Sequence, residues 1–218
     1  MPAQARSRTA PRPRRTGRPT LEQAAELDQS VRECALRLFL EHGYEGTSMD
    51  AIAREAHTTK MSLYGRFASK EELFLSVLEW ATKRPDWPVP EPDLPDLDDL
   101  EASLTVIAHA ALHRGLDPAM IQLGRIAVTQ AARFPEIARD HAVALWPRQK
   151  LVADLLRRHA ATGAIVADDP EVLAEHFLGM VAGMPARLAS YGTVRDPADQ
   201  ERRTQIAIRL FLRGLRPG

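Results

Sequence analysis

Residues 58–70 contain three cations and no acid, a composition that suits contact with a phosphate backbone. Side chains at the start of a helix that lies in the major groove reach the base edges. Lysine donates there to guanine O6 and N7, and an apolar side chain packs against thymine methyl groups. We therefore expect Lys60 to read guanine and Met61 to lie against thymine. The four side chains predicted to face the bases are Thr58, Thr59, Lys60 and Met61.

Two short helices joined by a turn of three or four residues must carry these side chains. Thr47 with Asp50 resembles a capping box that opens the first helix. Thr58 or Thr59 is expected to cap the second helix. Such an arrangement is a helix-turn-helix. Its predicted inward-facing residues are Ile52, Ala53 and Leu63.

The segments on either side of this motif have the apolar spacing of helices. Apolar residues recur every three or four positions from Leu27 to Phe39, and Gly43 is expected to end that helix. Ser69 precedes two glutamates and is expected to open a helix that runs to about residue 84. The motif is therefore predicted to lie between two longer helices.

A spaced set of residue types runs through 47–73: Thr47, Ile52-Ala53, Ser62-Leu63-Tyr64, Phe67 and Ser69-Lys70-Glu71-Glu72-Leu73. This set resembles the DNA-binding domain of TetR-type transcriptional regulators, and the resemblance is strong over about residues 28–80. It implies that Thr47, Tyr64 and Lys70 hold phosphates. Contacts of that kind set the register on DNA and carry no sequence information.

Four positions depart from the pattern of that family. His57 stands where the turn usually has glycine, and histidine tolerates a left-handed backbone better than most residues. Gly65 is expected inside the second helix, where it costs about 0.5–1 kcal/mol relative to alanine. Met61 replaces a small residue, and Arg66 stands where an aromatic residue or histidine is common. These departures bear on base preference and leave the fold prediction unchanged.

The rest of the chain predicts further helices after a break. Five prolines between residues 85 and 95 favour an extended connector, assigned to 85–97. Helices are expected near 98–114, 118–133, 136–159 with a break or kink at Pro147, 170–191 and 198–215. The predicted fold is all-α, with a helix-turn-helix domain at 20–84 and a helical ligand-binding and dimerisation domain at 98–218.

Charge is distributed unevenly although the formal net charge is zero. Residues 1–19 hold six arginines and no acid, which leaves 23 basic against 29 acidic residues in the remainder. This segment is expected to be a disordered basic arm. It suggests nucleic acid as a partner, through phosphate attraction or minor-groove insertion, although a solvated tail accounts for the same charge.

Several protein classes are excluded by composition. The longest run without Asp, Glu, Lys or Arg has twelve residues, whereas a membrane-spanning helix needs about 17–25 apolar ones. No apolar run follows the basic N-terminus as in a secretory signal. A single cysteine, Cys34, is expected in the core and excludes an internal disulfide framework and a multi-cysteine zinc site. We therefore expect a soluble cytoplasmic protein.

The family resemblance also implies a small-molecule pocket in the C-terminal domain and a homodimer. The dimer is assigned to residues 170–191 and 198–215, where Gly179 and Gly183 would let a partner helix approach closely. The residues proposed to line the pocket, each of which also fits a plain core role, are His109, His113, Met120, Leu123, Trp146, Phe177, Met180 and Met184. The two histidines at i and i+4 lack the glutamate of a metalloprotease motif, and we expect no metal and no cofactor.

These observations predict a sequence-specific, ligand-responsive transcriptional regulator rather than an enzyme. The favoured form is a repressor that releases a pseudo-palindromic operator when it binds a small, mostly apolar molecule. Two alternatives stay open: an activator or ligand-independent regulator of the same fold, and a helical interaction or ligand-binding module that does not bind DNA. The sequence has neither a Gly-rich phosphate loop nor a nucleophile elbow, so an enzyme is the least favoured class.

Overall fold

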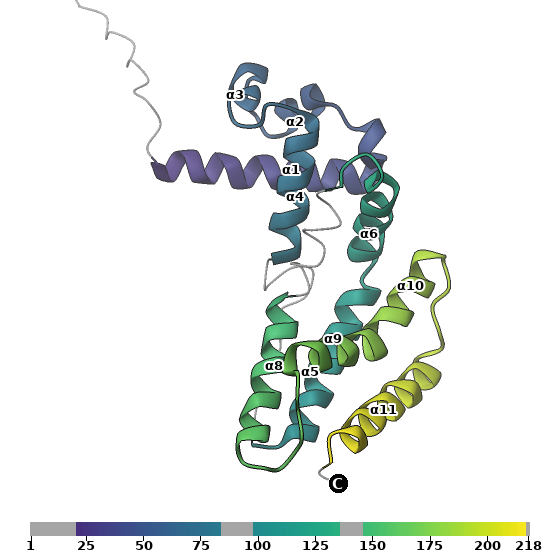
Figure 1. Cartoon of the computed structure of the whole chain (residues 1–218). Coiled ribbons are helices and arrows are strands. Elements are labelled where there is room, and N and C mark those ends of the chain that lie inside the picture. Colours follow the sequence, from purple (N-terminus) through teal and green to yellow (C-terminus); the bar gives the residue numbers. More distant parts are fainter. Residues whose placement is uncertain (1–20, 84–97, 136–145, 217–218) are drawn as a thin grey trace, which may run out of the picture.

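The computed structural model describes residues 21–83, 98–135 and 146–216, and within these ranges the chain forms helices and no strand (Figure 1). The all-α prediction is therefore confirmed. The predicted arm at 1–19 and the predicted linker at 85–97 lie outside the described residues. So does the first part, 136–145, of the helix predicted over 136–159.

The N-terminal helices form a helix-turn-helix on a long support. α1 (Leu21–Gly46) packs against α4 (Lys70–Lys83), and α2 (Met49–Glu55) and α3 (Lys60–Tyr64) lie together beside them (Figure 1). Gly43 interrupts α1 with a φ of 71°, a left-handed conformation that glycine adopts without steric cost. The helix that was predicted to end at Gly43 turns there and continues for one short stretch.

Four of the C-terminal helices that the structure describes start at aspartate caps. Proline follows three of these caps, at a position whose N–H would have no acceptor inside the helix. The elements are α5 (Leu100–Leu116), α6 (Pro118–Gln130), α8 (Trp146–Ala161), α9 (Pro170–Leu178), η1 (Gly179–Gly183), α10 (Met184–Ser190) and α11 (Pro197–Gly214). The caps are Asp99, Asp117, Asp169 and Asp196.

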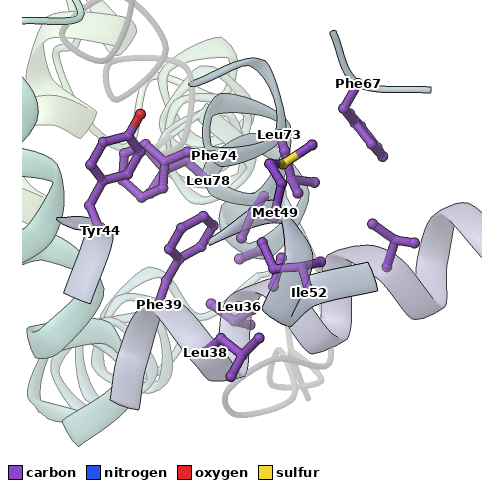
Figure 2. Close-up of a cluster of buried hydrophobic side chains, with 14 of the residues drawn as sticks. Leu36, Leu38, Phe39, Tyr44, Met49, Ile52, Phe67, Leu73, Phe74 and Leu78 are labelled. Atoms are coloured by element: carbon purple, nitrogen blue, oxygen red, sulfur yellow. The ribbon is translucent and has the colours of Figure 1, made fainter. Parts of the chain in front are cut away.

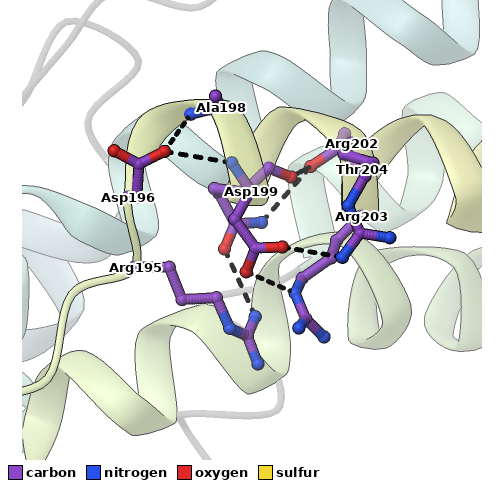
Figure 3. Close-up of polar contacts among 8 residues, drawn as sticks. Arg195, Asp196, Ala198, Asp199, Arg202, Arg203 and Thr204 are labelled. Atoms are coloured by element: carbon purple, nitrogen blue, oxygen red, sulfur yellow. Dashed lines mark hydrogen bonds and ion pairs between the residues drawn. The ribbon is translucent and has the colours of Figure 1, made fainter.

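The start of α11 shows how charge supports such a cap (Figure 3). Asp196 accepts from the backbone N–H groups of Ala198 and Asp199 at 2.9 and 3.3 Å. The Asp199 carboxylate in turn pairs with Arg202 at 2.7 Å and Arg203 at 2.8 Å. Hydrogen bonds from these guanidinium groups, that of Arg203 first, lower the pKa of Asp199. A negative charge therefore stays in the first turn of α11, where the helix dipole favours it.

Two predicted helices differ from the observed ones. The segment predicted as one helix over 170–191 contains a π-helical turn, η1, between α9 and α10. This widened turn directly precedes Pro185, whose ring would clash with the carbonyl four residues earlier in a regular α-helix. The helix predicted over 136–159 with a break or kink at Pro147 is described only from Trp146, where α8 begins with Pro147 in its first turn.

One hydrophobic core joins the helix-turn-helix unit to α6. Figure 2 shows its centre, where the rings of Phe39 and Tyr44 each lie about 5 Å from that of Phe74, at 5.1 and 5.0 Å between centroids. Phe134, which follows α6, is buried with its ring centroid 5.5 Å from that of Tyr44. α6 itself adds Leu123, Ile126 and Ala127 to this core. The predicted domain bounds place α6 in the C-terminal domain, yet the apolar face of α6 packs into the core of the N-terminal helices.

A second core lies among α5, α8, α9, η1 and α11. Its centre contains Phe177 and Phe211, whose ring centroids are 4.9 Å apart. α5 contributes Leu104 and Ile107, and α8 contributes Leu156, all almost fully buried. Arg125 of α6 donates to two carbonyls at the end of α10, so α6 is also bonded to the C-terminal helices. α6 therefore joins the first core to the C-terminal helices.

None of the described helices combines the length and the apolarity that a bilayer crossing requires.

Candidate DNA-binding site

The turn between α2 and α3 has the conformation that the sequence predicts. His57 has a φ of 49°, so it occupies the left-handed region where the family usually has glycine. Thr59 caps α3, because its hydroxyl oxygen accepts from the backbone N–H of Ser62 at 3.1 Å. The predicted left-handed turn and the threonine cap are both confirmed.

Thr47 is a buried structural residue, and this corrects its predicted role as a phosphate contact. Its hydroxyl lies 3.0 Å from the carbonyl oxygen of Leu38 and 2.8 Å from that of Gly43. The side chain is 3% exposed, so it holds the chain reversal after Gly43 and does not face solvent. Ser48 caps α2 by accepting from a backbone N–H of its first turn at 3.1 Å. The predicted capping box of Thr47 with Asp50 is therefore wrong.

The two helices have one buried face and one exposed face. The three residues predicted to face inward, Ile52, Ala53 and Leu63, are buried. On the opposite face Met61 is 84% exposed and Tyr64 is 42% exposed. The other predicted base readers also reach this surface, Thr59 and Lys60 exposed and Thr58 half-buried. The sequence therefore places the proposed contact residues where DNA can reach them, and their contact with DNA stays a prediction.

Lys60 forms an ion pair with Asp50 of α2. Its Nζ atom lies 2.8 Å from Oδ1 and 3.1 Å from Oδ2 of that carboxylate, and both side chains are mostly exposed. The Asp50 carboxylate accepts a hydrogen bond from Lys60 and thereby raises the pKa of the ammonium. The Nζ atom also lies 5.9 Å from the centroid of the Tyr64 ring. Lys60 is therefore fully charged and held at the surface of the helix-turn-helix.

Lys70 connects the end of α1 to the start of α4. Its ammonium donates to the carbonyl oxygens of Tyr44 and Thr47 at 2.9 and 3.1 Å. It also lies 4.2 Å from the centroid of the Tyr44 ring, and burial raises the pKa of that phenol. Two of the three N–H donors of Lys70 thus support the fold, which leaves one donor and the positive charge for a phosphate.

Arg66 is bonded to α1 and so is not a surface cation. Its guanidinium pairs with the carboxylate of Asp28 and donates to the carbonyl oxygen of Ala24 at 3.2 Å. The side chain is 20% exposed, so of the three cations of 58–70 Arg66 is the one held by the fold in an ion pair with α1. Gly65 forms the C-cap of α3, so the predicted cost of a glycine inside that helix does not apply.

Sequence reasoning did not identify two residues of this surface, Ser48 and Asp50. Ser48 stands directly before α2, and a serine ahead of an aspartate two positions on is a usable cap signal. No local sequence pattern predicts the ion pair between Asp50 and Lys60. The two residues are ten positions apart, and only the packing of α2 on α3 brings them together.

The residues predicted to line a ligand pocket are not brought together in the described part of the chain. Leu123 belongs to the first core and Phe177 to the second. His109 lies on the surface with its Nε2 atom 2.8 Å from a Glu201 carboxylate oxygen, so it bridges α5 to α11. Of the rest, His113, Met180 and Met184 are exposed and Met120 is half-buried, while the Trp146 side chain lies outside the described set.

This fold and site define a class of protein. A helix-turn-helix with an exposed second helix, set on an all-helical body, is the architecture of a DNA-binding transcriptional regulator. Two family models match the chain. Residues 32–77 match bacterial regulatory proteins of the tetR family, and residues 102–215, just over half of the chain, match the C-terminal domain of AefR-like transcriptional repressors. The chain belongs to the TetR family of transcriptional regulators.

Individual relatives and solved structures agree with this assignment. The chain is 28% identical over 170 residues to the transcriptional repressor AcnR of Corynebacterium diphtheriae, covering 75% of this chain and 82% of AcnR. It is 37% identical to the regulator AcrR of Shigella flexneri over 62 residues, which span 28% of this chain and 29% of AcrR.

Among solved structures, the flavonoid-responsive regulator FrrA superposes with a TM-score of 0.68 at 29% identity, covering 88% of this chain and 98% of FrrA. A TetR regulator from Agrobacterium tumefaciens superposes with a TM-score of 0.67 at 23% identity, covering 88% of this chain and 95% of that one. The second likeness concerns the fold alone.

Proposed function

We propose that this regulator is a homodimeric repressor that binds a pseudo-palindromic operator and releases it when a small, mostly apolar molecule binds its helical domain. The observation that carries the proposal is the match of residues 102–215 to the AefR-like repressor domain, in a chain with an exposed recognition face. AcnR is a repressor, which supports repression, and FrrA is flavonoid-responsive, which supports an effector of this chemical kind. Such a protein acts in the cytoplasm, where the bacterial chromosome lies.

The proposed DNA contacts follow from exposure and charge. Thr58, Thr59, Lys60 and Met61 are assigned to base edges, since they begin the recognition helix on its outer face. Tyr64 is assigned to a phosphate through its hydroxyl, and Lys70 through the one ammonium proton that the fold leaves unused.

The proposed dimer pairs the last helices of two copies. Four large apolar side chains on η1, α10 and α11 stand exposed: Met180, Met184, Ile206 and Leu210. A row of this kind on helices that end the chain suits burial against a second copy. Gly179 and Gly183 support close approach, because no atom lies within 4 Å of a Cβ built on either. Two linked heads would then bind DNA far more tightly than one.

α6 is the element that we assign to the effector response. Its apolar face and Phe134 belong to the core of the DNA-binding head, and its Arg125 is bonded to the end of α10 beside the proposed dimer helices. An effector that moves α6 relative to α10 therefore changes the position of the head within the dimer. α4 contributes a second connection, since the Arg114 guanidinium of α5 lies 3.5 Å from the Ala81 carbonyl oxygen.

A reporter experiment tests this proposal. An operator retained by the purified protein is placed upstream of a reporter gene, and the protein is expected to lower its transcription. A panel of flavonoids and related planar aromatic compounds is then added, and an active compound should weaken operator affinity about 5–150-fold and restore transcription. Transcription that rises with the protein present would favour an activator. A panel without any effect on affinity would contradict the proposed class of effector.

A variant separates the response from DNA binding itself. Phe134→Leu removes the ring contact to Tyr44 and keeps an apolar side chain in the core. We expect operator affinity without effector to stay close to that of the wild type, and the effector-induced weakening to shrink. An undiminished effector response in Phe134→Leu would argue against the assigned route through α6.

A further inference from the structure

We infer that Asp50 and Lys60 act together as one reader of a G·C base pair, in which Lys60 donates to guanine O6 and N7 and Asp50 accepts from cytosine N4. The inference rests on the proposed function, and it adds an acidic residue of α2 to the side chains that set operator sequence. Asp50 would then be a specificity-determining residue.

The geometry of the ion pair matches the edge of a G·C pair. Guanine O6 and cytosine N4 lie side by side in the major groove, an acceptor next to a donor, because they are hydrogen-bonded to each other. That hydrogen bond has a usual length of about 2.7–3.2 Å. The donor and acceptor that the protein presents, Lys60 Nζ and Asp50 Oδ1, are 2.8 Å apart. Each group can therefore meet its complement while the ion pair stays intact.

An A·T pair fits the same two side chains less well. Its adjacent groups are the adenine N6 donor and the thymine O4 acceptor. If the carboxylate accepted from N6, the ammonium could donate to adenine N7 or to thymine O4, but these acceptors lie on opposite sides of N6 and it would reach only one of them. Guanine N7 instead offers the ammonium a second acceptor beside O6, and lysine has three protons to donate. The pair therefore favours G·C with guanine on the Lys60 side.

The electrostatic setting supports an intact pair on DNA. Asp50 is an exposed carboxylate on the surface that would approach phosphates, where an unpaired negative charge would be repelled. Lys60 neutralises it, and Lys60 itself lies near the ring of Tyr64. Exposed ion pairs contribute little to folding stability, so stability alone gives weak reason for this contact on the recognition face.

Selection of DNA from a random library tests the inference. The wild type should select G·C at one position of each half-site. Asp50→Ala and Lys60→Ala should each relax that position, and the double variant should relax it no further than the stronger single one. A duplex with N4-methylcytosine at that position loses the groove-facing donor and keeps O6 and N7. It should bind the wild type about five-fold or more weakly, and it should bind Asp50→Ala as the unmethylated duplex does.

Glu55→Ala is the matched control. Glu55 is an exposed carboxylate of the same helix and is ion-paired with Arg37 of α1 at 2.7 Å, so its removal changes the charge equally but leaves the recognition helix untouched. It should keep the G·C preference. Uniform weakening of all sequences by Asp50→Ala, or unchanged wild-type binding to the methylated duplex, would overturn the inference and leave the proposed function standing. A wild type that selects no sequence would overturn both. The methylated duplex decides the question on the wild type alone if Asp50→Ala does not fold.

Discussion

Lys60 and Lys70 have different surroundings, from which we infer different roles. Lys60 is exposed, and its ion-pair partner Asp50 is another surface side chain, so the pair is free to turn toward a base edge. Lys70 is half-buried and donates to two backbone carbonyls where α1 meets α4. Lys60 is therefore suited to reading sequence, whereas Lys70 is suited to holding the head together and to attracting any DNA.

Lys70→Met tests the contribution of Lys70 to stability and to DNA binding. The variant keeps an apolar stem and loses two charge-assisted hydrogen bonds, each of a kind that contributes about 1.5–3 kcal/mol. We expect the free energy of unfolding to fall by about 1–3 kcal/mol and affinity to fall alike for operator and random DNA. Urea unfolding and fluorescence anisotropy measure the two effects. Lys150→Met, at an exposed position of α8, is the control and should change neither.

Thr47→Val tests whether Thr47 is structural. Valine fills the same volume without a hydroxyl, so the carbonyls of Leu38 and Gly43 lose their buried donor. The expected loss of stability is about 1–3 kcal/mol. Thr47→Ser keeps the hydroxyl and should lose much less. Sequence preference measured on selected DNA should be the same for both. A Thr47→Val protein of wild-type stability that binds all DNA weakly would instead restore the phosphate role.

Contacts between residues that are near in sequence were predictable, and contacts between distant ones were not. The Thr59 cap and the left-handed His57 depend on local backbone geometry, so both can be predicted from the residue types at these positions. Asp28 with Arg66 joins positions 38 apart, and nothing local distinguishes that arginine from a surface cation. The same holds for the internal hydrogen bonds of Lys70.

At the scale of elements, α1 depends on a single left-handed residue. Gly43 has a φ of 71° and turns the chain so that Tyr44 reaches the aromatic centre and the Thr47 hydroxyl reaches the Gly43 carbonyl. Any other L-residue is strained in that conformation. The regular helix is interrupted at Gly43, where the sequence predicts its end, and a short helical stretch follows to Gly46.

Gly43→Ala measures this strain. Its Cβ would meet no atom within 4 Å, so the cost is conformational. With a φ of 71° and a ψ of 176°, Gly43 lies in a region that essentially only glycine adopts, and the substitution should lower the free energy of unfolding by about 1–3 kcal/mol. Gly124→Ala in the interior of α6 is the matched control. Its Cβ also meets no atom within 4 Å, whereas its backbone is helical. That substitution should raise stability by about 0.5–1 kcal/mol. Equal effects of the two substitutions in thermal or urea unfolding would contradict the account.

The sequence predicts helix starts better than it predicts helix partners. Aspartate before proline identifies the starts of α6, α9 and α11, since the cap and the first turn are local. The apolar stripe of α6 gives no sign of which core will bury it. Its packing with the head could be learned only from the folded chain. The predicted pocket residues lie apart for the same reason, because Leu123 and Phe177 belong to two different cores.

At the scale of the whole molecule, the proposed dimer face and the DNA-binding head are joined through α6. Arg125 bonds α6 to the end of α10, and Phe134 carries the same segment into the aromatic centre beside Tyr44. A surface ion pair between Arg133 and Glu45, at 3.3 Å, lies next to this contact. In the proposed dimer, the spacing of the two heads would be set by the packing of α6 on α10.

Gly183→Glu tests the dimer. Gly183 is exposed and its Cβ would meet no atom of its own chain, so the monomer accepts the larger side chain. In the proposed dimer the carboxylate would be buried without a partner, which costs several kcal/mol. Light scattering at micromolar concentration should show a dimer for the wild type and a monomer for the variant. Ala164→Glu, in the exposed turn after α8, should stay dimeric. A monomeric wild type or a dimeric Gly183→Glu would refute the assigned interface.

A symmetric dimer that reads DNA sequence should retain particular fragments of a genome. Fragments of the host genome are passed over the purified wild-type protein at physiological salt, and the retained DNA is sequenced. We expect enrichment of a pseudo-palindrome whose half-sites lie about 10–10.5 base pairs, or a multiple of that spacing, apart. Retention of fragments in proportion to their abundance, with no shared symmetric sequence, would contradict this expectation.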